Sequence, residues 1–142
     1  MRSTRPWNFW LIPLLASCST GGGHSEAVQS VDRVIANEST FIGTFVIVDG
    51  YLRFGDDSHN LWADHTAYLA VANHDPPPDD PAWSRCIALY GINGWWETLL
   101  KNNGRQVRVR GILQRHVPEP EEVNLSECSD LGLAIKSVTR SK

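Results

Sequence analysis

The chain has 142 residues, of which 13 are Lys or Arg and 16 are Asp or Glu, so its formal net charge at pH 7 is −3. Nucleic-acid-binding domains are usually basic, and this mild acidity therefore argues against a general nucleic-acid binder. A chain of this length is long enough for one hydrophobic core, which predicts a single folded domain.

Residues 1–17 have the layout of a secretory signal. Arg2 and Arg5 precede an almost wholly apolar stretch, WNFWLIPLL (7–15), and small residues follow it. A transmembrane helix needs about 20 apolar residues, and this stretch has about half of that number. We therefore expect the segment to be a signal peptide that is removed, and not a permanent anchor.

The junction Leu15-Ala16-Ser17-Cys18 resembles the lipobox of bacterial lipoproteins. The resemblance implies that diacylglycerol is attached to the Cys18 thiol, that a signal peptidase cuts before Cys18, and that the new amino terminus is acylated. Two or three acyl chains hold a protein on a membrane where one chain does not. Ser19 follows the cysteine, which in lipoproteins of two-membraned bacteria implies the outer membrane, facing the periplasm. The alternative is an ordinary secretory signal that leaves a free cysteine.

With Cys18 assigned to lipid, Cys86 and Cys128 remain as a pair. An exported protein folds in an oxidising compartment, so we expect these two residues to form a disulfide. The alternative is a metal or redox site, but neither cysteine lies in a Cys-x-x-Cys motif and no His is within four residues of either. Removal of residues 1–17 also removes two arginines and no acid, which leaves 11 basic against 16 acidic residues, a net charge of −5.

The mature chain is expected to start with a tether. Residues 18–40 begin with small polar residues and three consecutive glycines, a composition typical of flexible linkers. Apolar residues later in this segment recur at helical spacing, which is compatible with a short helix around 26–36. We expect the folded domain to span residues 41–142.

Five segments have the composition or the alternation of β-strands. They are rich in β-branched and aromatic residues, or they alternate between apolar and polar side chains. The first two are expected to form a hairpin, and Gly50 within the first is expected to mark a bulge or a sharp bend. The predicted strands are 41–54, 59–64, 86–90, 105–113 and 131–139.

The segments between these strands differ in how clearly they can be assigned. Residues 66–73 fit a short helix and an extended segment equally well. The proline-rich HDPPPDDP (74–81) is neither helix interior nor central strand. GWWETLLKNN (94–103) predicts a short helix that ends at Gly104. Residues 114–130 are acidic and interrupted by proline, which predicts a loop.

The element order (three strands, a helix and two more strands) resembles that of the OB-fold, a five-stranded Greek-key barrel. The stretch GRQVRVRGIL (104–113) is similar to the fourth strand of many small bacterial OB domains. The resemblance implies a mainly β barrel with one short helix between strands three and four. In that topology the third and fifth strands are neighbours, which would bring Cys86 and Cys128 together. Another small β-barrel and a β-sandwich with one helix are the alternatives.

Patterns that indicate catalysis or metal binding are weak in this sequence. His59, His65 and His74 lie near several aspartates, but their spacings match no zinc motif, and catalytic zinc needs three convergent ligands. No G-x-S-x-G nucleophile elbow is present in the sequence. The paired carboxylates fall in predicted loops instead of facing each other across a cleft. We therefore predict no catalytic residue, no metal and no cofactor, with a metal- or carboxylate-dependent envelope enzyme as the less favoured alternative.

Aromatic and basic side chains are the best candidates for a binding surface. OB-folds use aromatic side chains as stacking platforms, and two arginines share one face of the 105–113 strand. The simpler interpretation of these arginines is a solvated face that discourages sheet-to-sheet aggregation. Trp95 and Trp96 are adjacent and cannot both face one core, so one is expected near the surface as an anchor for a partner. The candidate surface comprises Tyr51, Trp62, Trp95, Trp96, Arg108 and Arg110.

These features predict a membrane-anchored periplasmic lipoprotein that acts as a non-catalytic binding module for a protein or an envelope oligosaccharide. Nucleic acid is not expected as a partner. One alternative is an immunity or inhibitor lipoprotein that blocks a periplasmic toxin or lytic enzyme, with the acidic 119–130 loop or the Trp95-Trp96 region entering a cleft. A purely structural role in an envelope assembly is a further alternative.

Overall fold

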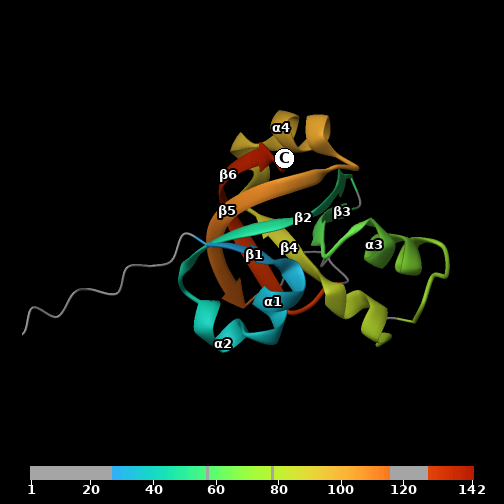
Figure 1. The fold of residues 1–142 in the computed structure, drawn as a ribbon. Coiled ribbons are helices and arrows are strands. Elements are labelled where there is room, and N and C mark those ends of the chain that lie inside the picture. Colours follow the sequence, from blue (N-terminus) through green and yellow to red (C-terminus); the bar gives the residue numbers. More distant parts are fainter. Residues whose placement is uncertain (1–26, 57, 78, 116–127) are drawn as a thin grey trace, which may run out of the picture.

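The computed structural model describes residues 27–56, 58–77, 79–115 and 128–142, and its centre is a six-stranded mixed sheet (Figure 1). The predicted signal peptide, Cys18 and most of the acidic loop lie outside the described residues. The strands are β1 (Val28–Ser30), β2 (Phe45–Gly55), β3 (Ser58–Trp62), β4 (Cys86–Tyr90), β5 (Gln106–Arg115) and β6 (Leu131–Arg140). The helices are α1 (Val31–Ala36), α2 (Glu38–Phe41), α3 (His65–Ala72) and α4 (Trp96–Asn102), with 3₁₀ helices η1 (Pro81–Arg85) and η2 (Ile92–Gly94).

The strands follow the order β1-β2-β3-β4-β6-β5, and β2 also pairs with β5. The pairings of β2, β3, β4, β6 and β5 therefore form a closed circuit. Two pairings in the sheet are parallel, β1 with β2 and β4 with β6, and the others are antiparallel. The predicted hairpin of β2 and β3 is confirmed, as is the mainly β character of the chain.

The predicted five strands with a single helix are too few elements. A sixth strand and two helices form within residues 28–41, which the sequence assigns mainly to the tether. Residues 66–73, which fit both a helix and an extended segment, are helical up to Ala72 in α3, and η1 follows before β4. The elements within 28–41 and within 65–85 form because their apolar side chains pack against the sheet. The local sequence pattern does not reveal this packing.

The segment 28–36 is part of the packed domain. β3 pairs with residues 51–55 of β2, and β1 pairs in parallel with residues 47–49 of the same strand. Ser30 then caps α1, its hydroxyl accepting a hydrogen bond of 3.2 Å from the backbone N–H of Arg33. Val31 and Val34 are completely buried in the main core. The packed domain therefore includes residues 28–36, which the sequence pattern places in the tether.

Alternation along the strands supplies most of this main core. Val107 and Val109 of β5 are completely buried, as the pattern predicts, and Leu133 and Ile135 of β6 are also buried. Leu99 of α4 is completely buried in the same cluster. Figure 1 shows α4 at one end of the sheet and α1 with α2 at the other.

Two glycines are required by close approach of neighbouring strands. The pairing of β2 with β5 runs from Phe45 to Tyr51 without a register shift, so Gly50 does not form the predicted bulge. A Cβ atom at Gly50 would lie 2.6 Å from the carbonyl oxygen of Trp62. At Gly111 a Cβ atom would collide with the backbone of β6, and the register shift of the β5–β6 pair lies between Arg110 and Gly111.

A second apolar cluster lies on the opposite face of the sheet from the main core. Tyr51, Trp62 and Cys86 belong to β2, β3 and β4, and side chains of α3 and η1 cover them. Cys86 and Cys128 form the predicted disulfide, with 5.1 Å between their Cα atoms. The disulfide joins the start of β4 to the segment that leads into β6.

None of the helices formed by the described residues is both long enough and apolar enough to cross a membrane.

Candidate functional site

Tyr51 of β2 and Trp62 of β3 are covered by another segment of the chain. Tyr51 and Trp62 are opposite each other in the β2–β3 pair and therefore share one face. Tyr51 is only 9% exposed and Trp62 only 2%. The ring of Trp62 lies 5.8 Å from that of Tyr68 and 6.1 Å from that of Trp83. The predicted role of Tyr51 and Trp62 as exposed stacking platforms is therefore wrong, because the chain's own 65–85 segment occupies this face.

Polar contacts hold this covering layer in place. Asp64 caps α3 through a 2.7 Å hydrogen bond to the N–H of Ala67. Arg85 at the end of η1 binds both Asp32 of α1, at 2.7 Å, and Asp64, at 3.3 Å. The hydrogen bond to Asp32 is the main cause of the raised pKa of Arg85. These ion pairs are partly exposed and contribute little energy singly, but they join α1, α3 and η1.

The histidines are divided between separate clusters. The His59 ring stacks at 5.0 Å on Phe54, and burial lowers the pKa of His59. His65 lies instead beside Tyr51, with 4.7 Å between the ring centroids. His74 is exposed after the end of α3. Across the described ranges, no three His, Cys, Asp or Glu side chains are grouped so that they could hold a metal ion.

The two adjacent tryptophans near α4 face different surroundings. Trp95 is partly buried and packs against the main core. Trp96 is 38% exposed, and Leu100, one turn later, is 46% exposed. The Trp96 ring meets Phe54 edge-on, with 4.9 Å between the centroids. The prediction that one tryptophan faces the core and the other the surface is confirmed, and Trp96 is the exposed one.

The two candidate arginines of β5 are exposed on the outer face of the sheet. Arg108 forms two hydrogen bonds to Asp49 of β2, at 2.8 and 2.9 Å, and these are the main cause of its raised pKa. The guanidinium of Arg110 lies 5.4 Å from the centroid of the Phe45 ring, within the range of a cation–π contact. The charge of Arg108 is therefore balanced by a neighbour, and Arg110 lies over an exposed aromatic ring.

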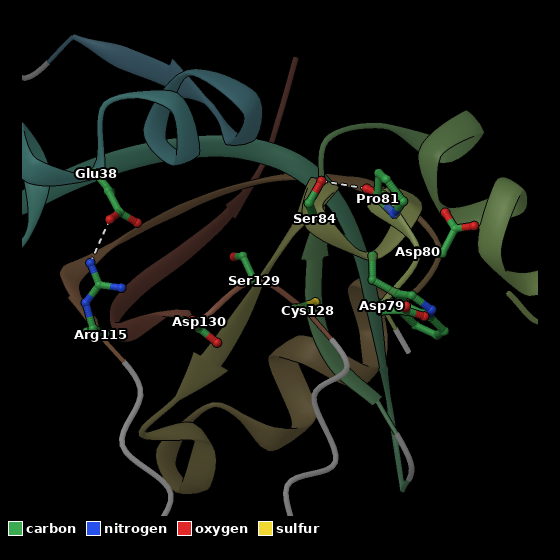
Figure 2. A pocket seen from close by; sticks show the side chains of 10 residues that line it. Glu38, Asp79, Asp80, Pro81, Ser84, Arg115, Cys128, Ser129 and Asp130 are labelled. Carbon is green, nitrogen blue, oxygen red and sulfur yellow. Dashed lines mark hydrogen bonds and ion pairs between the residues drawn. The ribbon is translucent and has the colours of Figure 1, made fainter. Parts of the chain in front are cut away.

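An open cavity of about 390 Å³ lies beside the disulfide, lined by residues of α2, η1 and the segment 128–130 (Figure 2). Arg115 and Glu38, which both line it, form an ion pair of 2.6 Å at one side of the cavity. The hydroxyl of Ser129 donates to the carbonyl of Cys86 at 2.6 Å, and Asp80 accepts from a backbone N–H of η1. These groups are engaged in local structure, and of the lining residues only Cys128 is a predicted site residue. The lining carboxylates are Glu38, Asp79, Asp80 and Asp130.

The structure thus separates the predicted binding residues into three groups. Tyr51 and Trp62 are covered, Trp95 packs on the core, and Trp96, Arg108 and Arg110 are accessible. The accessible residues lie on two surfaces, one on α4 and one on the outer face of β5. These surfaces also carry three exposed apolar residues that the sequence pattern does not identify: Leu100, Phe45 and Val28.

A comparison of the chain with models of protein families found no match, and a comparison with curated proteins also found none.

Proposed function

We propose that the protein is an exported, lipid-anchored binding module whose domain is a barrel of the OB type. The closed circuit of β2, β3, β4, β6 and β5 supports the barrel assignment. So does the position of α4 between β4 and β5. Counted in chain order, the third and fifth strands of this circuit are β4 and β6, and they are neighbours, as the OB topology requires. β1, α1, α3 and η1 are additions to that barrel.

The proposed anchor is lipid on Cys18, and the proposed location is the outer membrane facing the periplasm. Its support is the lipobox Leu15-Ala16-Ser17-Cys18 after a charged and apolar start. Cells fed a clickable fatty acid should label the parent chain and not a Cys18→Ala variant. Labelling that persists in the Cys18→Ala variant would overturn the anchor.

We infer that the partner is a protein that contacts α4. The single observation that carries this inference is the exposed pair of Trp96 and Leu100, which lie four residues apart and therefore side by side on the helix. Tryptophan is enriched among the residues that dominate protein–protein binding. The contact of Trp96 with Phe54 orients its ring, which lowers the entropy lost on binding.

A protein partner is favoured over an oligosaccharide because Tyr51 and Trp62 are covered. Sugar and nucleic-acid ligands of OB-folds bind the face of the second and third barrel strands, which correspond here to β3 and β4. Trp62 of β3 is 2% exposed on that face. The proposed module acts by binding and not by catalysis.

A photo-crosslinking amino acid placed at Leu100 tests the proposed partner surface in intact cells. We expect a discrete protein adduct from this position and not from Lys101, which is exposed on the same helix. Trp96→Ser should abolish the adduct, and urea unfolding of this variant shows whether it is still folded under the crosslinking conditions, since the ring also packs on Phe54. Equal adducts at both positions, or none at Leu100, would refute the surface. An adduct that resists protease but not glycosidase would identify an oligosaccharide instead, and a toxin or lytic enzyme in the adduct would identify an inhibitor.

A further inference from the structure

The outer face of β1, β2 and β5 carries exposed apolar side chains in register. Val28 is paired with Ile47, and Phe45 is paired with Ile112. Val28 is 41% exposed and Phe45 is 49% exposed, the largest value among the exposed large apolar residues. Residues opposite each other in a sheet project to the same side, so these side chains form one surface. We name it the sheet-face patch: Val28, Phe45, Ile47 and Ile112.

Two basic side chains, Arg110 and Lys136, lie beside the sheet-face patch. Arg110 is paired in register with Ile47, and its guanidinium lies over Phe45. Lys136 is exposed at the register shift of β6 beside Arg110. The carboxylate of Asp49 is held by two hydrogen bonds from Arg108. The patch therefore combines apolar side chains with a basic border, in a mature chain that is acidic as a whole.

The position of the patch relative to Cys18 restricts what can cover it. Nine residues, 19–27, separate Cys18 from Val28, the first residue of β1. Fully extended, nine residues reach about 30 Å. A domain of about 115 residues has a radius of gyration of about 13 Å and is about 35 Å across. Because β1 is paired with β2, the chain enters the domain within the patch itself, as the position of β1 beside β2 in Figure 1 shows.

We propose that the sheet-face patch docks on the phospholipid surface that holds the anchor, an inference that rests on the proposed lipid at Cys18. A surface at the point where a short tether enters the domain stays closer to the membrane than one at the far end. Apolar side chains are accommodated at the boundary between headgroups and acyl chains. Arg110 and Lys136 then face anionic headgroups, to which basic side chains near a membrane are attracted. The domain would thus be held in one orientation, with α4 directed away from the lipid.

Fluorescence quenching by brominated lipid tests this docking. The chain starting at Cys18 keeps every described element, and Cys18 is its one thiol outside the disulfide. It is coupled through that thiol to a maleimide lipid in vesicles of phosphatidylethanolamine and phosphatidylglycerol, with or without brominated acyl chains. Phe45→Trp adds a fluorophore to the patch, and Leu100→Trp adds one on α4 with nearly the same exposure, 46% against 49%.

We expect brominated vesicles to cause a loss of emission from Phe45→Trp that is absent from the parent chain and from Leu100→Trp. Arg110→Gln in the Phe45→Trp background, or replacement of phosphatidylglycerol by phosphatidylcholine, should reduce that loss. Equal losses from Phe45→Trp and Leu100→Trp, or no added loss from Phe45→Trp, would overturn the docking. Absence of added loss is also the result if the patch binds a protein instead.

Two controls keep the outcome interpretable. If Phe45→Trp changes the urea midpoint, Val28→Trp in the same patch replaces it, because Val28 is also exposed. Chemical coupling at Cys18 replaces acylation in the cell, so the quenching result does not depend on whether the cell attaches lipid to Cys18. Loss of fatty-acid labelling in cells refutes the anchor, whereas loss of quenching in coupled vesicles refutes the docking.

Discussion

Replacing Val34 by Ala tests whether the segment before β2 belongs to the folded domain. Val34 lies on α1, is completely buried and packs in the main core. The substitution removes two buried carbon groups, each worth about 0.8 kcal/mol of transfer free energy. The cavity that remains adds roughly 1 kcal/mol, so the expected loss is about 2.5 kcal/mol in the free energy of unfolding.

Urea unfolding followed by tryptophan fluorescence, with the disulfide intact, measures this loss. With a slope of about 1.5 kcal/mol per molar urea, a loss of about 2.5 kcal/mol lowers the midpoint by roughly 1.7 M. The slope itself should not change, since the native surface stays nearly the same. Val28→Ala is the matched control, because Val28 is 41% exposed and a surface change of this kind costs at most about 0.5 kcal/mol.

The two valines give opposite expectations within one short segment. If Val34→Ala lowers the midpoint no more than Val28→Ala does, α1 does not pack against the sheet. The reasoning that places residues 28–36 in the domain would then be refuted, and the segment would be the tether that the sequence pattern predicts. A large effect from both valines would contradict the exposure of Val28.

Three further variants test other parts of the fold. Replacing Cys86 and Cys128 by Ser removes a link across 42 residues, which costs about 4 kcal/mol in the chain-entropy treatment and lowers the urea midpoint. Gly111→Ala places a methyl group against the backbone of β6 and should cost about 1–3 kcal/mol by the same measurement. Burial lowers the pKa of His59 below 6.5, so the folded state favours the neutral ring. The contribution of the neutral ring to the free energy of unfolding is fully present above about pH 6.5 and is lost as the pH falls through the folded pKa. The parent should therefore lose stability between about pH 7.5 and pH 5.5, and His59→Gln should lose less.

Each of these predictions has a result that would contradict it. The disulfide prediction fails if the double serine variant unfolds at the midpoint of the parent. The control for Gly111→Ala is Gly55→Ala, since a Cβ atom at Gly55 meets nothing within 4 Å; equal effects at the two glycines would refute the close approach. An unchanged pH dependence in His59→Gln would show that burial of His59 is not linked to stability.

Much of the strand arrangement could be predicted from local patterns. The alternation of Val107 and Val109 with polar residues identifies β5 and the side it buries. The run CIALY predicts β4 with the same bounds that the structure has. The cysteine pair was predictable because assigning Cys18 to lipid leaves two partners, and the structure joins Cys86 to Cys128.

The candidate binding surface was predicted less well. An aromatic residue on a strand carries no local sign of whether another segment covers it. Tyr51 and Trp62 have the composition of stacking platforms, but α3 and η1 lie over them. The sequence predicts that one of Trp95 and Trp96 is exposed, because adjacent side chains point in different directions, but it does not specify which. The exposed surface around Phe45 depends on the pairing of β1, β2 and β5 and has no local signal.

Local features could be predicted without the structure: the strand periodicity, the position of α4, the available cysteine pair and the lipobox pattern. These depend on neighbouring residues, and local backbone preferences and side-chain alternation are enough to specify them. Only the tertiary structure shows that Val31 and Val34 complete the core. It also shows that the side chain of Trp62 is buried, whereas those of Trp96 and Phe45 are exposed. Burial depends on contacts between segments distant in the chain, and no local pattern specifies which of them meet.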